Sequence, residues 1–344
     1  MNDFMKHKNV ISTNPFTVTL LKWFEEYGRS LPWRETTDPY AIWLSEIILQ
    51  QTRVQQGWDY WERFMHRFPH VEDLAAATQD EVLRLWQGLG YYSRARHLHE
   101  AAKQVVALGH FPNTMSELKA MKGVGDYTAA AIGSIAFGLP VAVVDGNVYR
   151  VLSRYFGIST PINTTEGQKE FAELAQSLLP TSAPSAYNQA IMDFGAIQCT
   201  PTSPRCLICP LADSCEALRS GKTSELPVKL RKLKIKKRHF SYIYLRCQGM
   251  TAFHKRSAGD IWQGLWEPLL IENADLPVFS APLSLIKKGV KHVLTHRVLT
   301  ADFYLVELNQ RPSLPEDYIW IPEDELDQYA LPRLIEILLA SLPA

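Results

Sequence analysis

Four closely spaced cysteines are the feature that most limits how this chain can fold. They follow the pattern C-x6-C-x2-C-x5-C and are Cys199, Cys206, Cys209 and Cys215. Thiolates at such short intervals can close around one metal ion or cluster, and soft sulfur ligands select zinc or iron–sulfur centres. Zinc ribbons usually have two CxxC pairs, whereas only Cys206 and Cys209 form one here. The spacing therefore favours a [4Fe-4S] cluster and leaves zinc as the alternative.

Hydrophobic periodicity and charge divide the chain into parts. Apolar residues recur three and four positions apart from about residue 16 to 219, which predicts helices. The next segment, 226–240, has 7 basic residues and no acidic one. After it, apolar and polar residues alternate, which predicts strands, and a helical pattern covers 323–339. We therefore expect a multi-domain protein with an all-α domain over 1–225, a basic linker over 226–240 and an α+β domain over 241–344.

The overall composition excludes several classes of protein. The 344 residues include 36 basic and 36 acidic side chains, and 46% are hydrophobic, so the chain is neither disordered nor collagen-like. No apolar run approaches the roughly 18 residues of a membrane span, and the N-terminal residues lack the apolar segment of a signal peptide. We expect a cytoplasmic protein without a membrane partner. The fifth cysteine, Cys247, lies on a predicted strand and is expected in a core.

Two acidic residues are candidates for acid–base chemistry. Glu46 lies in a stretch compatible with a helix, 40–53, among mostly apolar neighbours. Desolvation raises the pKa of a carboxyl group, and a raised pKa suits a general acid near neutral pH. Asp145 follows an apolar stretch and could instead cap a helix over 147–156; Glu46 could instead lie exposed on a helix rim. Together the two carboxylates suit a reaction through an oxocarbenium ion, such as cleavage of a base from deoxyribose.

A glycine turn between two predicted helices is a candidate phosphate site. The segment Ser116–Phe137 predicts a helix, a Gly-Val-Gly turn at Gly123–Gly125, and a second helix. Glycines permit close approach, and the free N–H groups that open a helix can bind a phosphate oxygen. Such a turn is also common as a simple connection between helices.

Together these features resemble the MutY-type adenine DNA glycosylases of the helix-hairpin-helix (endonuclease III) superfamily. The segments that carry the resemblance are Leu31–Arg34, Asp38–Tyr40, Ser45–Val54, Gly88–Arg94, Gly123–Ala129, Val144–Arg150 and the cysteine cluster. The tail resembles that family's MutT-like (Nudix-fold) recognition domain, through Gly264–Pro268 and Leu294–His296. It lacks the metal-binding glutamate run of nucleotide hydrolases, so it is expected to recognise rather than hydrolyse.

The resemblance implies a fold and an activity. The fold would be an all-α helix-hairpin-helix core with its hairpin at 116–137 and a [4Fe-4S] loop at 199–215, followed by the Nudix-fold domain. The activity would be base excision repair, with removal of adenine paired with 8-oxoguanine or guanine. The partner would be double-stranded DNA, bound by a monomer in a bacterial cytoplasm. In this family the hairpin can also hold a monovalent cation through backbone carbonyls.

The resemblance also implies roles for residues near the reacting bond. Glu46 matches the family's general acid, which protonates the departing adenine. Asp145 matches the carboxylate that stabilises the oxocarbenium ion, and Asn147 resembles a residue that supports it. Tyr127 stands where bifunctional relatives have a Schiff-base lysine, so little or no β-lyase activity is expected.

Further residues are expected to contact DNA. By resemblance, Gln51 and Tyr91 enter the base stack, and the flipped adenine is surrounded by Trp33, Arg34, Leu49 and Gln189. Phosphate contacts are expected from Lys122, Gly123, Val124 and Gly125, where Met121 and Lys122 replace the family's usual Leu-Pro. In the tail, Leu294, Thr295 and His296 replace the usual Phe-Ser-His, so the Thr295 hydroxyl is expected to read 8-oxoguanine.

Two other functions remain open from the sequence. A mismatch glycosylase that removes thymine or uracil would share the cluster and can share Glu46 and Tyr127, but such relatives generally lack the long tail. A non-catalytic DNA-binding or redox-sensing iron–sulfur protein is the second alternative, and the joint presence of Glu46 and Asp145 argues against it.

Overall fold

The computed structural model describes residues 14–230 and 235–343. It forms two compact units, one of Met1–Arg53 with Gln104–Arg231 and one of Val54–Lys103 with Lys232–Ala344. The helices between residues 54 and 103 thus group with the C-terminal part of the chain. The division at residues 225 and 241 rests on the sequence pattern and stays a prediction.

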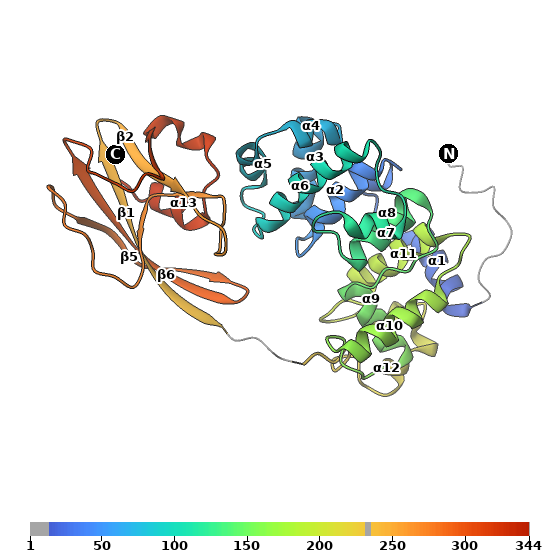
Figure 1. The fold of residues 1–344 in the computed structure, drawn as a ribbon. Helices are drawn as coiled ribbons and strands as arrows, with labels where there is room; N and C mark the ends of the chain where they lie inside the picture. The colour runs from blue at the N-terminus through green and yellow to red at the C-terminus, as the bar shows by residue number, and fades with distance from the viewer. Residues whose placement is uncertain (1–13, 231–234, 344) are drawn as a thin grey trace. The chain divides into compact units, whose positions relative to one another are not determined.

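The first unit is built of helices, labelled in Figure 1. They are α1 (Pro15–Tyr27), α2 (Pro39–Leu49), α7 (Met115–Ala120), α8 (Asp126–Phe137), α9 (Gly146–Phe156), α10 (Thr165–Leu178), α11 (Pro184–Asp193) and α12 (Glu216–Arg219). Its core combines Phe16 and Leu20 of α1 with apolar residues of α8, α9, α10 and α11. This agrees with the predicted all-α character.

Helix α2 is apolar on nearly all sides and is buried along most of its length. Asp38 caps its N-terminus by accepting a hydrogen bond from Tyr40 N (3.0 Å), and Pro39 occupies the first helical position. All of its residues from Tyr40 to Ile48 are buried, as expected for a helix without a polar face. The predicted extension to residue 53 is wrong, because Gln50 leaves the helical conformation and Gln51 adopts a left-handed φ of 58°.

The second unit contains α3 (Val54–Arg67), α4 (Val71–Ala76), α5 (Gln79–Trp86) and most of α6 (Ser93–Leu108), together with the sheet. The strands are β1 (Lys236–Cys247), β2 (Met250–Lys255), β3 (Trp266–Glu267), β4 (Leu269–Ile271), β5 (Ser284–Leu294), β6 (Arg297–Leu308) and β7 (Tyr318–Pro322). Within the described residues they form one sheet with the path β3-β2-β1-β6-β5, while β4 pairs with β1 and β7 with β2. Strands β1 and β6 run parallel.

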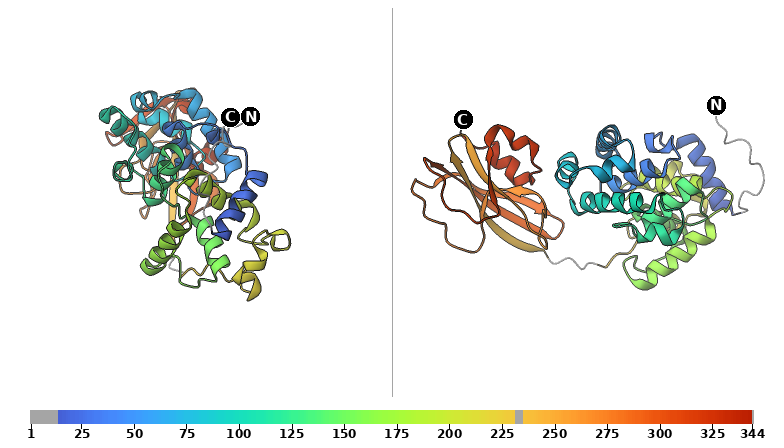
Figure 2. Two further views of the ribbon diagram at one scale, coloured as in Figure 1. Left: turned by 90° about the vertical axis from the view of Figure 1, so that its right-hand side faces the viewer. Right: turned by 45° about the horizontal axis from the view of Figure 1, so that its top comes forward.

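The sheet has an apolar core on each face. Helix α13 (Arg333–Leu339) covers one face, where Leu334, Ile335 and Leu338 join the core around Phe240 and Phe303 (Figure 2). The opposite core contains the buried Cys247, which is therefore the core thiol that the sequence predicts. The C-terminal part is an α+β fold, as expected.

The secondary structure of this region differs from the sequence-based expectations at two points. Strand β1 begins at Lys236, inside the predicted linker 226–240, of which residues 231–234 lie outside the described part of the chain. The predicted helix over 323–339 is a 3-10 turn, Glu323–Gln328, followed by α13, because Pro332 cannot continue a helix and restricts the residue before it. No helix in the described residues is long and apolar enough to cross a membrane.

Candidate active site and cysteine cluster

Glu46 lies on α2 inside the first unit and is almost fully buried. Its side chain is 8% exposed, so the alternative of a glutamate on an exposed helix rim is wrong. The Tyr127 hydroxyl, from α8, donates a hydrogen bond to Glu46 Oε2 (2.8 Å). Burial raises the pKa of Glu46 to about 7, and the negative charge of Asp145 adds to this rise, whereas the Tyr127 hydrogen bond and Arg34 oppose it. A carboxyl group with this pKa can hold and release a proton near neutral pH.

Asp145 is the N-cap of α9. Its Oδ1 accepts hydrogen bonds from Asn147 N (2.9 Å) and Val148 N (2.8 Å), and its Oδ2 accepts one from Asn147 Nδ2 (2.7 Å). The interpretation of Asp145 as a helix cap is thus confirmed. Burial raises the pKa of Asp145, while these three donors and the charge of Arg150 oppose the rise. The N–H groups at the start of a helix also favour the ionised form.

The two carboxyl groups therefore have different surroundings within one site. Glu46 receives one hydroxyl donor in a desolvated place, whereas Asp145 receives three N–H donors at a helix N-terminus. The negative charge of Asp145 disfavours ionisation of Glu46, whereas the N–H donors favour the ionised form of Asp145. This arrangement provides a proton donor and an anion close together.

Arg150 connects Asn147 to the loop of the first cysteine, a role that sequence reasoning did not assign. Its Nη2 donates hydrogen bonds to Asn147 Oδ1 (2.8 Å) and to the Gly195 carbonyl (2.6 Å), and its Nε donates to the Cys199 carbonyl (2.7 Å). The only sequence signal for it was an arginine one turn after Asn147 on the same predicted helix. Asn147 is therefore fixed on both sides of its amide.

Arg34 is held by a buried acid that the sequence did not indicate. Asp193, at the end of α11, is fully buried and accepts hydrogen bonds from Arg34 Nη1 and Nη2 (both 2.8 Å) and from Arg29. The two guanidinium groups lower the pKa of Asp193 despite its burial. Asp193 thereby fixes the segment that carries the buried Trp33.

Two other residues expected around the adenine, Leu49 and Gln189, lie on the helices α2 and α11. Leu49 is half-buried at the end of α2. Gln189 lies on α11 and donates a hydrogen bond from Nε2 to Ser185 Oγ (3.0 Å), one turn earlier on the same helix.

Gln51 and Tyr91, the residues expected to enter the base stack, share an unusual backbone conformation. Their φ angles are 58° and 47°, in the left-handed region that non-glycine residues rarely adopt, and both side chains are exposed. Such strain often occurs at functional sites. Within the second unit, the Tyr91 hydroxyl lies 2.5 Å from Thr295 Oγ1.

The predicted helix-turn-helix has the expected bounds. Helix α7 ends before Met121, Gly123 adopts a φ of 78°, and α8 begins after Gly125, which has no side chain to occupy the helix N-terminus. Lys122 is exposed and its backbone N–H donates to Gln104 Oε1 (2.7 Å). Val124, by contrast, is buried and anchors the turn.

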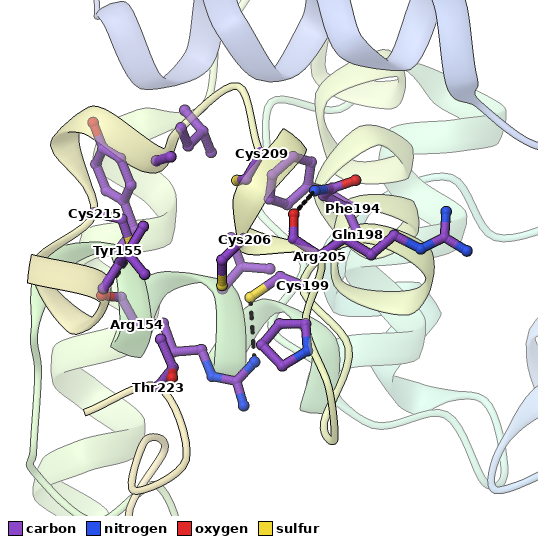
Figure 3. A pocket seen from close by; sticks show the side chains of 15 residues that line it. Arg154, Tyr155, Phe194, Gln198, Cys199, Arg205, Cys206, Cys209, Cys215 and Thr223 are labelled. Atoms are coloured by element: carbon purple, nitrogen blue, oxygen red, sulfur yellow. Dashed lines mark hydrogen bonds between the residues drawn. The ribbon is translucent and has the colours of Figure 1, made fainter. Parts of the chain in front are cut away.

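The four clustered cysteines line one pocket (Figure 3). Arg154 Nη1 lies 3.4 Å from Cys199 Sγ, and Val151, Phe194 and Leu211 supply apolar walls. Four thiols around a common space form a donor set that suits an iron–sulfur cluster. Among the described residues, no group of three or more His, Cys, Asp or Glu side chains is arranged to hold a single metal ion.

The expected lesion-reading residues lie at the tip of the β5–β6 hairpin. Thr295 and His296 are exposed between the strands, and Leu294 pairs with Arg297 across the turn. Leu294 is partly buried against the core on the α13 side. Arg297 Nη1 binds Asp260 Oδ1 (2.6 Å), and Asp260 also binds Arg238 and Arg256, so a half-buried charge network anchors the hairpin base.

Comparisons with known proteins agree with this geometry. Residues 44–177 match the HhH-GPD superfamily of base excision DNA repair proteins, 199–215 match the iron–sulfur binding domain of endonuclease III, and 241–341 match the NUDIX domain. An adenine DNA glycosylase of Buchnera aphidicola subsp. Baizongia pistaciae (strain Bp) is 35% identical over 306 residues, which cover 84% of this chain and 85% of that protein. The chain belongs to the adenine DNA glycosylase family. It is therefore a DNA-binding base excision repair enzyme that hydrolyses N-glycosyl bonds and has an iron–sulfur binding domain.

Two further relatives show how the match is distributed along this glycosylase. The mouse adenine DNA glycosylase is 42% identical over 233 residues, 64% of this chain but only 45% of the mouse protein. The structure of a thermostable thymine-DNA glycosylase is 33% identical, with a TM-score of 0.56, and covers 60% of this chain and 95% of that structure. Each of these two matches thus leaves more than a third of this adenine glycosylase without a counterpart.

Proposed function

We propose that this adenine DNA glycosylase removes adenine paired with 8-oxoguanine or guanine, with Glu46 as proton donor and Asp145 as stabilising anion. The observation that carries the proposal is the pair of carboxyl groups with opposed surroundings. Protonated Glu46 gives its proton to N7 of the flipped adenine, and the N-glycosyl bond breaks with its electron pair leaving on the base. The ionised Asp145 stabilises the positive charge on the sugar until water adds to it and loses a proton.

Neighbouring residues keep these groups in their protonation states. Asn147, itself held by Arg150, donates to Asp145 and fixes its orientation. Tyr127 donates to Glu46 and has a hydroxyl in place of an amine, so it cannot form a Schiff base with the sugar. Little or no β-lyase activity is expected for that reason.

The DNA-binding roles extend this proposal to the surrounding surface. We assign Trp33, Arg34, Leu49 and Gln189 to the adenine pocket, and Gln51 and Tyr91 to the space vacated by base extrusion. The open N-terminus of α8 and the turn 122–125 bind phosphate, with a monovalent cation on the turn's carbonyls. Thr295, flanked by Leu294 and His296, reads the base opposite adenine, and the enzyme acts as a monomer on a duplex in a bacterial cytoplasm.

A [4Fe-4S] cluster would be held by the four clustered cysteines, Cys199, Cys206, Cys209 and Cys215. When bound, it would crosslink the loop that contains them. A single zinc ion needs thiolates arranged tetrahedrally at about 2.3 Å from one point. The four cysteines share one pocket, and the match of residues 199–215 to the iron–sulfur binding domain of endonuclease III supports the cluster over zinc. Purified protein should contain about four iron atoms and four acid-labile sulfides per chain, whereas one zinc per chain would contradict the assignment.

Single-turnover base release tests the proposed specificity. Matched duplexes would carry adenine opposite 8-oxoguanine, adenine opposite guanine, thymine opposite guanine, and uracil opposite guanine. We expect release of adenine only, fastest opposite 8-oxoguanine, without strand cleavage. The resemblance to a thymine-DNA glycosylase makes the thymine duplex the critical control, since thymine release would overturn the proposal.

A further inference from the structure

Near the β5–β6 hairpin, the strand register shows which side chains lie on each face of the sheet. Lys237 of β1 aligns with Val298 of β6, which aligns with Val293 of β5. Aligned residues on paired strands point to the same side of a sheet, and neighbours along a strand point to opposite sides. Lys237 and Val293 therefore share one face, and Leu294 lies on the other.

The next row continues the face that contains Lys237. His239, Thr300 and Lys291 are aligned across β1, β6 and β5, and each lies two residues along its strand from a member of the first row. We call the surface formed by Lys237, His239, Lys291 and Val293 the basic face. All four side chains are exposed, and Val293 is 65% exposed. The opposite face is covered, since the ring of His292 lies tilted against Trp262 (5.7 Å between ring centroids) and Leu294 packs in the α13-side core.

Positive charge on this face is not balanced by nearby acids. Among the residues that the structure describes, neither Lys237 nor Lys291 has a carboxylate within ion-pair distance. The acid on this face, Asp302, is buried and already binds His239 Nε2 (3.2 Å) and the Gly289 N–H (2.7 Å). Two more exposed lysines, Lys287 and Lys288, follow along the edge strand β5.

The charge is local and does not reflect the composition of the region. Residues 241–344 have 9 basic and 13 acidic side chains, a net charge of −4, yet the segment 276–301 has no acidic residue. Figure 1 shows that this segment includes β5, at the edge of the sheet beside β6. Unpaired lysines on an exposed face bind phosphate as point charges and release counterions from DNA.

We propose that the basic face, through Lys237 and Lys291, binds the phosphodiester backbone of the DNA duplex. Lys291 is four residues before Thr295, which at about 3.3 Å per residue places it about 13 Å from the hairpin tip. One DNA strand advances about 3.4 Å per nucleotide, so this reach spans about four nucleotides. The placement of this contact next to the lesion rests on the proposed role of Thr295. The phosphate contact itself rests only on DNA binding by the enzyme.

Salt-dependent binding tests this assignment without using the proposed lesion specificity. The full-length, cluster-containing enzyme and its Lys237→Ala/Lys291→Ala variant would be titrated with an undamaged duplex from 50 to 200 mM salt. Each lost phosphate contact should make the slope of log K against log salt shallower by about 0.9. The slope of the double variant should therefore be shallower than that of the parent by about 1.8. Single-turnover adenine release at saturating enzyme should keep its rate.

Two matched variants complete the test. Lys22→Ala/Lys169→Ala removes the same charge from the exposed surfaces of α1 and α10 and should leave the slope unchanged. Lys237→Arg/Lys291→Arg keeps the charge and should keep the parent slope. An unchanged slope in the Lys237→Ala/Lys291→Ala variant, or an equal change in the α1/α10 control, would overturn the proposal.

Discussion

At the scale of single residues, two acids of the candidate site differ in the groups that surround them. Glu46 and Asp145 are both carboxylic acids near the same site, but only Asp145 receives backbone donors. Burial disfavours the charged form of Glu46, and the hydrogen bond from Tyr127 offsets only part of this effect. The proposed general acid is therefore expected to lower the folding stability, since its charged form is poorly solvated.

The pH dependence of excision should show the pKa of Glu46. Because the protonated acid is required, the single-turnover rate should fall about tenfold per pH unit above about 7. The Tyr127 hydrogen bond lowers the pKa of Glu46, so Tyr127→Phe should raise that pKa and shift the falling limb to higher pH. A limb that stays in place or moves to lower pH would show that another group controls it.

Glu46→Gln should stabilise the protein while stopping excision. The pKa of Glu46 rises from 4.5 to about 7 on folding, so the unfolded state ionises first and folding stability is lost as pH rises between these values. Above pH 7 the loss is about 3 kcal/mol at 1.36 kcal/mol per unit, and glutamine avoids it. The melting temperature should exceed the parent's by several degrees at pH 8 and match it near pH 4.5.

The exposed Glu166, on α10, provides the matched control for this measurement. Glu166→Gln should leave the melting temperature nearly unchanged at every pH. If Glu46→Gln melts at the parent temperature at pH 8, the desolvation assigned to Glu46 is wrong.

At the scale of elements, α9 links the two chemical centres of the first unit. Asp145 caps its N-terminus, and Arg154 near its C-terminus lies against Cys199. Arg150, between them, binds both Asn147 and the Cys199 carbonyl. A shift of this helix would change the orientation of Asp145 and the shape of the cysteine pocket together.

Gly195 sets the distance between α9 and the π-helical turn Phe194–Gln198. A Cβ at Gly195 would lie 2.6 Å from Asn147 Cβ and 3.0 Å from its backbone. Gly195→Ala should therefore displace Asn147, destabilise the protein by about 1–3 kcal/mol and slow excision. The matched control is Gly146→Ala, whose Cβ would meet nothing within 4 Å and should cost little stability. Equal melting temperatures of the two variants would contradict this packing.

Sequence patterns predicted the elements better than their ends or their partners. The helix-turn-helix over Ser116–Phe137 was predictable because its glycines and caps are local signals. The end of α2 at Leu49 was not, since no glycine or proline marks it and Gln50 turns away toward Thr128 Oγ1 (3.1 Å). Asp193 was also missed, because its two arginine partners are about 160 residues away in the sequence.

At the scale of the whole molecule, the cysteine pocket joins the C-terminal end of the helical sequence to α9, the helix that Asp145 caps. The loop 199–215 has only short 3-10 turns of its own, so a bound cluster would supply most of its order. The cysteine spacing predicted an iron–sulfur segment here because it is a local pattern, and the family match over residues 199–215 confirms an iron–sulfur binding domain.

Loss of the cluster should lower both stability and activity. Cys199→Ser removes one ligand from the pocket and disturbs the loop whose carbonyl holds Arg150. We expect a lower iron content, a lower melting temperature and slower adenine release. Cys247→Ser, in the buried core of the sheet, is the control: its melting temperature should fall while its iron content stays at the parent value. Equal iron contents in the two variants would contradict the ligand assignment.

The regular alternation of side chains near the tip of the β5–β6 hairpin has a consequence for insertions. Because Leu294 and Val293 point to opposite sides, one residue added between Lys291 and Val293 would exchange the two faces beyond it. The residue that packs in the core would then face solvent, and the tip would turn relative to Asp260 and its arginines. The length of this hairpin, and not only its side chains, therefore determines which residues its tip presents to the proposed DNA lesion.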